Sequence, residues 1–484
     1  MIKKNFFYQS LYRTVLIIAP LIVAPYVSRA LGPEGIGTNA LSLAVASYFV
    51  LFAMLGIGYH GNRTIAAVRD DPDKLSKTFS NLLALHIAIS GVVIVAYVMF
   101  IIFFTNDNRI YFIAQAPIVV AALINITWFF KGLENFKTVA LRNVLVKTIT
   151  VICVLIFVND RSDLWKYILI MAVGTLMGQL SVWLLIRKFV TFVKPSWNEM
   201  KPHIRPMLIL FIPILAMSIY TQFNRIMLGN MAGSVEIGFF SSSNKVMSIA
   251  MGFIWALNSV LIPRIANLNA KGDEKEKQKI TQTSMKYIMM LAFAMAFGIA
   301  AIAHDFAPLF FGEAFEPAGI LIFVLCIKLP ILAFGTTLAA QYIIPHSKDK
   351  VYSASAIAAA VVSLVANMIL IPSYGAMGAV VSMIGAESTR CVILTVASKK
   401  SLPIGTFLKN SIPFPIIGAA MFFLIRFVAD FLEQNTLSLL IQIGIGATFF
   451  LGVSAAYLHV TKDAFFRKFI IGISSRRNNQ NEKT

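Results

Sequence analysis

Long apolar runs separated by short polar connections dominate the pattern of this chain. A hydrocarbon core about 30 Å thick needs roughly 20 apolar residues of α-helix to span it. Because lipid leaves backbone groups unsatisfied and the runs are too long for barrel strands, the pattern predicts an all-α polytopic membrane protein with 14 transmembrane helices. The predicted spans are residues 10–30, 38–60, 79–104, 110–131, 138–158, 164–187, 206–230, 238–263, 282–303, 318–344, 351–371, 376–397, 411–430 and 437–459.

Positive charge alternates between successive connections. Lys and Arg gather in every second connection, while the opposite set holds little beyond Arg29, Arg109 and Arg161. Because Lys and Arg mark the cytoplasmic side, the pattern predicts an even number of spans and two cytoplasmic termini. The opposite connections are short, such as residues 106–109 and 372–374. A membrane glycosyltransferase or polymerase would be expected to carry a large external loop, so we disfavour that class.

The composition fits an embedded chain. Of 484 residues, 58% are hydrophobic and 13% are charged, and the formal net charge is +20. In a soluble protein this surplus would suggest nucleic acid, but topology explains the basic residues here, and we expect no nucleic-acid partner. The cysteines Cys153, Cys326 and Cys391 lie inside apolar runs, which indicates helix packing and no metal site. We also expect no cofactor and, without a nucleotide-binding or nucleophile motif, no enzyme.

Two parts of the chain match at an offset of 201 residues. The matched positions include Gly32 and Gly233, Ile36 and Ile237, Gly37 and Gly238, Ser42 and Ser243, Arg63 and Arg264, and Lys74 and Lys275. Six predicted spans separate the copies, so both run in the same direction. The repeat therefore predicts two parallel six-helix bundles, residues 1–190 and 205–398, related by an axis along the membrane normal. Two additional helices in residues 411–459 and a basic cytoplasmic tail, 460–484, follow.

Five short motifs indicate a family. They are residues 25–37 (PYVSRALGPEGIG), 224–229 (NRIMLG), 236–240 (EIGFF), 262–266 (IPRIA) and 372–379 (PSYGAMGA). In this order and spacing the whole chain resembles Wzx-type polysaccharide flippases of the multidrug/oligosaccharidyl-lipid/polysaccharide exporter superfamily. That superfamily also contains lipid II flippases and MATE drug exporters.

The resemblance implies a fold, a location and an activity. The fold would be a MATE-like, V-shaped pair of bundles in a bacterial inner (plasma) membrane. The activity would be transfer of undecaprenyl-diphosphate-linked oligosaccharide, such as an O-antigen repeat unit, from the cytoplasmic to the periplasmic leaflet by alternating access. The implied partners are this lipid-linked cargo and membrane lipid, with a polysaccharide polymerase and chain-length proteins as further possible partners.

One departure from the family concerns acidic residues. Relatives often carry a carboxylate at the position of Asn224 and another near Met54, and both are absent here. A cation-coupling site built on those carboxylates therefore does not carry over. The alternative function, a MATE-like cation-coupled small-molecule exporter, shares the fold but would prefer carboxylates that capture cationic drugs. The excess of cations over acids within the spans argues against it.

The cargo predicts a cationic, water-filled cavity, because a diphosphate must cross hydrocarbon. Arginine suits phosphate through its planar, bidentate fork. A charge in mid-membrane costs at least ~2.5–3.5 kcal/mol, so an intramembrane cation is a functional candidate by default. The candidates for the cavity are Arg225, Lys328, Arg29, Arg13, Arg63 and Arg264.

Four of the six candidates also have a structural interpretation. Arg225, near the external end of its span, is the strongest, and Lys328 lies in mid-span beside Pro330, which frees a backbone carbonyl. Arg13 could instead snorkel to the surface, and Arg29 could be an interfacial anchor. The repeat-related Arg63 and Arg264 could form an entry gate for phosphate or simply follow the charge rule for cytoplasmic ends.

Glu387 and Arg390 form a separate candidate. They are three residues apart and share a helix face, so a mutually neutralised ion pair is one reading. The other reading is that Glu387 takes up H+ or Na+ to couple transport.

Overall fold

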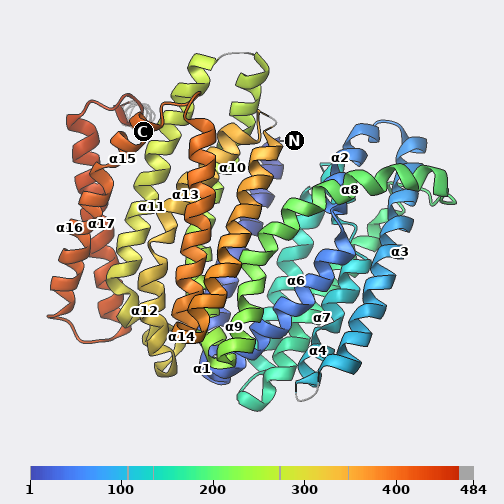
Figure 1. Cartoon of the computed structure of the whole chain (residues 1–484), viewed down its shortest axis with the longest axis horizontal. Helices are drawn as coiled ribbons and strands as arrows, with labels where there is room; N and C mark the ends of the chain where they lie inside the picture. The colour runs from blue at the N-terminus through green and yellow to red at the C-terminus, as the bar shows by residue number, and fades with distance from the viewer. Residues whose placement is uncertain (1, 106–107, 135, 272–273, 347, 468–484) are drawn as a thin grey trace, which may run out of the picture. The chain divides into compact units, whose positions relative to one another are not determined.

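The described part of the chain is entirely helical. The computed structural model describes residues 2–105, 108–134, 136–271, 274–346 and 348–467. The side chains of residues 2–20, 136–142, 259–260, 262–264, 266–271 and 274–275 lie outside this description. Within it there is no β-strand (Figure 1). Long apolar sequences form helices here because helical hydrogen bonds satisfy every interior backbone group within the segment.

The helices fall into long and short elements. In the first half they are α1 (Ile2–Met54), α2 (Ile57–Val68), α3 (Pro72–Phe104), α4 (Arg109–Leu123), α5 (Thr127–Gly132), α6 (Phe136–Phe157), η1 (Arg161–Asp163), α7 (Leu164–Ile186), α8 (Trp197–Ser218), η2 (Ile219–Phe223) and α9 (Asn224–Ala232). In the second half they are α10 (Ser234–Lys271), α11 (Glu274–Phe311), η3 (Glu313–Phe315), α12 (Glu316–Leu325), α13 (Lys328–Leu338), η4 (Ala339–Ile343), α14 (Asp349–Ser398), α15 (Ile404–Ser411), α16 (Pro413–Ala429) and α17 (Thr436–Val460).

Many of these helices are apolar enough to cross a membrane. Eight helical segments of the described chain pass by length and composition, and the pair α12 and α13, bent by 47°, adds a ninth. The chain is therefore a multi-span membrane protein. The count of 14 spans stays a prediction.

Two helices account for part of the difference between these counts. Helix α1 covers most of the first two predicted spans, and α14 contains two more, at residues 351–371 and 376–397. Inside α1 the backbone leaves helical geometry at Gly32 (φ 66°, ψ 178°). Inside α14 it does so at Gly375 (φ 51°, ψ −129°). Both breaks lie at predicted connections, and only glycine adopts such positive φ values without strain.

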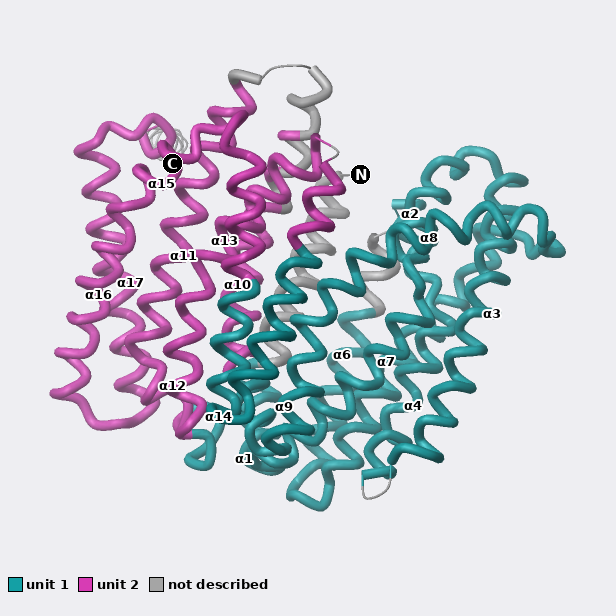
Figure 2. The backbone as a smooth tube through the Cα atoms, viewed as in Figure 1, with its two compact units in different colours: residues 1–242, 310–315, 356–386 teal, residues 243–309, 316–355, 387–484 magenta. Residues whose placement is uncertain are grey.

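The helices form two compact units, coloured separately in Figure 2. Unit 1 comprises residues 1–242, 310–315 and 356–386, and unit 2 comprises residues 243–309, 316–355 and 387–484. Phe79, Trp128 and Phe129 anchor one fully buried core of unit 1. The four-part division expected from the repeat stays a prediction.

The repeat-related turns lie together inside unit 1. Gly233 (φ 88°, ψ 173°) has nearly the same backbone conformation as its counterpart Gly32. A Cβ atom at Gly37 would overlap the carbonyl oxygen of Ser234, and a Cβ atom at Gly238 would overlap that of Pro33. Since Ser234 and Pro33 also match at the 201-residue offset, the two contacts are reciprocal. These glycines allow two helix starts to approach at backbone distance.

The turn at Gly375 is held by a half-buried carboxylate contact. The backbone N–H of Ala376 donates to Glu236 Oε2 at 2.6 Å. Glu236 lies in the first turn of α10, and the turn residue Gly375 packs against its side chain. Two of the motifs that carried the family resemblance, residues 236–240 and 372–379, therefore meet in unit 1.

Candidate functional site

Arg225 lies in a membrane helix of unit 1, directly after a π-helical turn. The turn, η2, separates α8 from α9, and π-turns often mark functional positions. The Arg225 Nη1 donates to Gln222 Oε1 at 2.7 Å. Its Nε is buried and has no hydrogen-bond partner among the described residues. The guanidinium thus contacts a neutral amide and retains an unused donor.

A cluster of uncharged polar groups lies next to Arg225 in the sequence. Asn224 Oδ1 accepts from Ser363 Oγ at 3.0 Å and from Asn367 Nδ2 at 2.7 Å, and all three side chains are fully buried. The Asn224 Nδ2 and the Asn367 Oδ1 have no partner within the described structure. Buried amides without partners are costly in a medium of low dielectric constant. Asn224, where the family resemblance implied a carboxylate, therefore joins α9 to α14 through amides and a hydroxyl.

Lys328 begins α13 at the break between α12 and α13 in unit 2. Its side chain is 7% exposed, and its Nζ donates to Asn244 Oδ1 of α10 at 3.2 Å. The break falls two residues before Pro330, which lies in the first turn of α13. The helix is therefore broken beside this lysine, next to the proline that was expected to free a backbone carbonyl. The buried ammonium group donates to an amide oxygen of α10.

Glu387 and Arg390 lie on one face of α14, in the part that belongs to unit 2. Arg390 Nη1 is 3.6 Å from Glu387 Oε2, and the two residues are 5% and 8% exposed. The Arg390 guanidinium also lies 5.5 Å from the centroid of the Tyr352 ring, within cation–π range. The structure forms the ion pair that the sequence spacing predicts, and a coupling role stays a prediction.

The remaining candidates lie apart from these contacts. Arg29 is exposed in α1 and packs its stem against Gly312. Arg63 is exposed in α2. The side chains of Arg13 and Arg264 lie outside the described residues. Of the candidate residues, Glu387 and Arg390 are therefore the two whose direct contact the structure shows.

Several polar contacts were missed by the sequence interpretation. His60 Nε2 lies 2.9 Å from His203 Nδ1 in unit 1, and Arg426 Nη1 lies 3.3 Å from Asp305 Oδ2 in unit 2. The signal for the second contact was present, because Asp305 and Arg426 each interrupt an apolar run. Which helices would meet was not readable from one chain.

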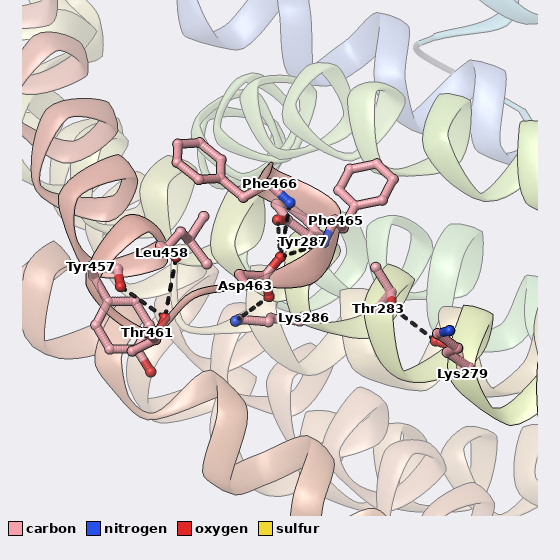
Figure 3. A network of polar contacts seen from close by, with 10 residues as sticks. All are labelled: Lys279, Thr283, Lys286, Tyr287, Tyr457, Leu458, Thr461, Asp463, Phe465 and Phe466. Carbon is pink, nitrogen blue, oxygen red and sulfur yellow. Dashed lines mark hydrogen bonds and ion pairs between the residues drawn. The ribbon is translucent and has the colours of Figure 1, made fainter. Parts of the chain in front are cut away.

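A polar network fixes the segment that follows α17 (Figure 3). Asp463 accepts hydrogen bonds from Lys286 Nζ at 2.8 Å and from Tyr287 Oη at 2.9 Å. Its Oδ1 also accepts from the backbone N–H groups of Phe465 and Phe466. Burial raises the pKa of Asp463, but these donors outweigh it and place the pKa below the ordinary 3.8. These hydrogen bonds hold the segment directly after α17 against α11.

The described side chains offer no metal centre. No group of three or more His, Cys, Asp or Glu residues among them could hold a metal ion. Cations that donate to amide oxygens, broken helices and many membrane-spanning helices are together typical of a membrane transport protein.

Comparison with known proteins identifies the family. The family described as polysaccharide biosynthesis protein matches residues 2–269, and the chain belongs to it. A protein of Shigella dysenteriae named "Putative O-antigen transporter" is 23% identical over 388 residues, which are 80% of this chain and 97% of that protein. The resemblance predicted from the five motifs, to flippases of the exporter superfamily, is confirmed, and the relatives are transporters rather than enzymes.

Two solved structures share the fold. Lipid II flippase MurJ in an inward closed conformation superposes with a TM-score of 0.78 at 14% identity, over 94% of this chain and 99% of that one. An inward-facing multidrug resistance MATE family transporter of the MOP superfamily gives 0.63 at 16% identity, over 84% and 99%. The predicted MATE-like fold is therefore confirmed.

Proposed function

We propose that this protein moves an undecaprenyl-diphosphate-linked oligosaccharide from the cytoplasmic to the periplasmic leaflet of a bacterial inner membrane. The relative named as an O-antigen transporter and the lipid II flippase fold support a lipid-linked sugar as cargo. Movement follows alternating access of two halves, with both termini in the cytoplasm. A polysaccharide polymerase and chain-length proteins act on the product in this proposal.

The observation that carries the proposal is the unneutralised guanidinium of Arg225. A cation inside a membrane protein normally pairs with an acid or faces water. Arg225 instead contacts the neutral Gln222, and its Nε donor is unused among the described groups. The diphosphate supplies the missing anion, because phosphate oxygens accept from the guanidinium fork in a bidentate geometry. Arg225 therefore binds the part of the cargo that lipid excludes most strongly.

Lys328 provides a comparable cation in unit 2. Its Nζ also rests on an amide oxygen, that of Asn244, at a helix break. A lysine contributes a compact charge and three donors rather than a planar fork. We assign it the role of a phosphate contact of unit 2, with less control of orientation than the guanidinium of Arg225 provides. Arg29, Arg63, Arg13 and Arg264 complete the proposed cationic path.

We further propose that Glu387 couples transport to H+ or Na+. Uptake of a proton by Glu387 removes the negative partner of Arg390, and the buried pair then separates. This event links ion uptake to a rearrangement of α14. Without ion uptake by Glu387, the proposed cationic cavity supports uncoupled flipping.

Removing the charge of Arg225 tests the function. Arg225→Gln keeps a donor at this position and abolishes the cation. A hydrogen bond to a charged group contributes about 1.5–3 kcal/mol, so flipping should fall roughly 10- to 150-fold. The readout is transfer of a fluorescent undecaprenyl-diphosphate oligosaccharide between leaflets of proteoliposomes, detected with an impermeant quencher.

The matched control is Arg187→Gln, which removes an exposed cation at the C-terminus of α7. It should leave the rate within about twofold, because an exposed charge contributes little. Equal flipping by wild type and Arg225→Gln would remove Arg225 from the proposal. Absence of flipping by wild type, together with drug efflux, would favour the MATE-like exporter.

A further inference from the structure

A polar cavity lies in unit 2 beside the connection between α16 and α17. Figure 1 shows this connection at the end of the α16–α17 pair opposite the C-terminal segment. It occupies about 260 Å³ among the ends of α11, α16 and α17 and the connection between the last two helices. Its polar lining includes Asp305, Arg426, Asp430, Glu433, Asn435 and Gln442. The charge pattern predicts that this end faces away from the cytoplasm.

The cavity contains an unused acceptor on the second turn of a membrane helix. Gln442 lies in the second turn of α17, is 4% exposed and lines the cavity. Its Oε1 has no hydrogen-bond partner among the described residues. Placing an unsatisfied amide oxygen in an apolar helix is costly, so it indicates a ligand or water that supplies the donor.

The other polar groups are held in place. Asp305 is 9% exposed, and its Oδ2 lies 3.3 Å from Arg426 Nη1. Asn435 caps α17, since its Oδ1 accepts from the Ser438 backbone N–H at 2.8 Å. The apolar packing of Ile302 in α11, Met421 in α16 and Phe450 in α17 holds the three helices together beside the cavity. The site is thus assembled before any ligand binds.

This mixture of groups selects one class of ligand. The described acids do not form a metal-binding group, and a bare ion would leave most of the space empty. A hydrocarbon would leave the carboxylates and amides unpaired. A sugar ring offers neighbouring hydroxyls that donate to carboxylates and to the Gln442 oxygen and accept from Arg426 and the amide nitrogens. The volume is just below the usual range for small-molecule sites, about 300–1,000 Å³, and suits a single sugar residue.

We propose that this cavity is a saccharide subsite, which binds one sugar residue through its hydroxyl groups at the predicted periplasmic end of unit 2. The choice of saccharide rests on the proposed function, whereas the cavity and its unused acceptor do not. The subsite receives the glycan of the cargo through contacts separate from those of Arg225 with the diphosphate.

Saturation-transfer difference NMR on the full-length protein in nanodiscs tests the proposal. The protein is purified in a detergent without a sugar head group, and the probes are free maltose, lactose and N,N′-diacetylchitobiose. Wild type should give signals from at least one of these disaccharides. Gln442→Leu removes the unused acceptor, and Glu433→Ala removes an exposed carboxylate from the connection. Each should weaken binding about tenfold, the loss typical of a hydrogen-bonded polar contact.

The matched control is Ser454→Ala in the same helix. Ser454 is also buried with an unpartnered oxygen, but it does not line the cavity. Its removal should leave the disaccharide signals unchanged. Thermal unfolding of every variant checks folding, and Glu433→Ala, on the exposed connection, keeps the test valid if Gln442→Leu does not fold.

Two results would overturn the subsite: no signal from any disaccharide with wild type, or equal signals from wild type and both cavity variants. Its failure is separable from failure of the proposed function. Flipping by wild type without disaccharide binding removes the subsite alone. Disaccharide binding lost in the cavity variants, with no flipping by wild type, supports the subsite and removes the proposed function.

Discussion

The arginines in the apolar helices of the two compact units have different partners. In unit 1, Arg225 donates to the neutral amide of Gln222. In unit 2, Arg390 pairs with Glu387, and Arg426 lies against Asp305. An arginine that forms an ion pair with a carboxylate of the protein is neutralised within the fold. An arginine that contacts only a neutral amide has a charge that remains available to an anionic ligand. The difference separates structural cations from cations that can serve a cargo.

The largest expected effect is on the stability of unit 2. Glu387→Gln leaves Arg390 buried without its carboxylate, and breaking a buried pair in this way costs about 3–5 kcal/mol. The double variant Glu387→Gln, Arg390→Gln should recover much of this loss, because no uncompensated charge remains. Thermal unfolding in nanodiscs measures both.

The control for this pair is Arg69→Gln, which breaks the exposed pair of Arg69 with Glu134. It should leave the unfolding temperature nearly unchanged, since surface ion pairs contribute little. If the single and double variants of the buried pair lose the same stability, Glu387 is not the group that neutralises Arg390.

A smaller effect is expected from giving unit 1 the charge pattern of unit 2. Gln222→Glu is nearly isosteric and puts a carboxylate where the amide oxygen now accepts from Arg225 Nη1 at 2.7 Å. Flipping should fall about tenfold, equivalent to about 1.4 kcal/mol, because the cargo diphosphate must displace an internal anion. The proteoliposome assay measures the rate, and thermal unfolding should show no loss of stability.

Gln278→Glu provides the matched control, since it makes the same chemical change at an exposed position of α11. It should leave the flipping rate unchanged. An undiminished rate for Gln222→Glu would mean that the charge of Arg225 is not available to the cargo, and the contrast between the units would lose its functional meaning.

The smallest effect is expected at the C-terminal network of unit 2. Asp463→Asn should lower stability by about 1 kcal/mol at pH 7, because a partly solvated ionic contact with Lys286 is lost. The folded-state pKa of Asp463 lies below 3.8, so its stabilisation is fully present above that value and is lost as pH falls through the lowered pKa.

The difference in unfolding temperature between wild type and Asp463→Asn should therefore be constant from pH 5 to 7 and shrink in more acidic buffer. Lys279→Gln, an exposed change in the same helix, should show no such dependence. A difference that grows on acidification would contradict a stabilising carboxylate at Asp463.

Much of the fold could be predicted from the sequence because apolar length and glycine position are local properties. The interruptions at Gly32 and Gly375 lie at predicted connections, and the helix break beside Lys328 lies next to Pro330. The number of spans was harder to predict, because α1 and α14 each continue as one helix across the breaks at Gly32 and Gly375. Hydropathy identifies an apolar run long enough to span a membrane, but it does not show at which residue one helix ends and the next begins.

The site could be predicted only in part. Arg225 and Lys328 were readable as cations within apolar runs, and the spacing of Glu387 and Arg390 predicted their pair. Their other partners come from distant segments: Asn244 lies 84 residues from Lys328, and Asn367 lies 143 residues from Asn224. A single sequence does not show which faces of two helices are in contact. It therefore predicted neither the amide partners nor the cavity beside Gln442.

The reciprocal glycine contacts constrain how this chain can change over time. Gly37 rests on the carbonyl of Ser234, and Gly238 rests on the carbonyl of Pro33. When a side chain crowds another side chain, a smaller neighbour can restore the fit. Here the neighbour is main chain, which every amino acid shares, so no substitution at Pro33 or Ser234 makes room. A suppressor of Gly238→Ala must therefore arise elsewhere, by moving a whole helix. Each glycine contacts the segment that matches its own surroundings at the offset of 201 residues.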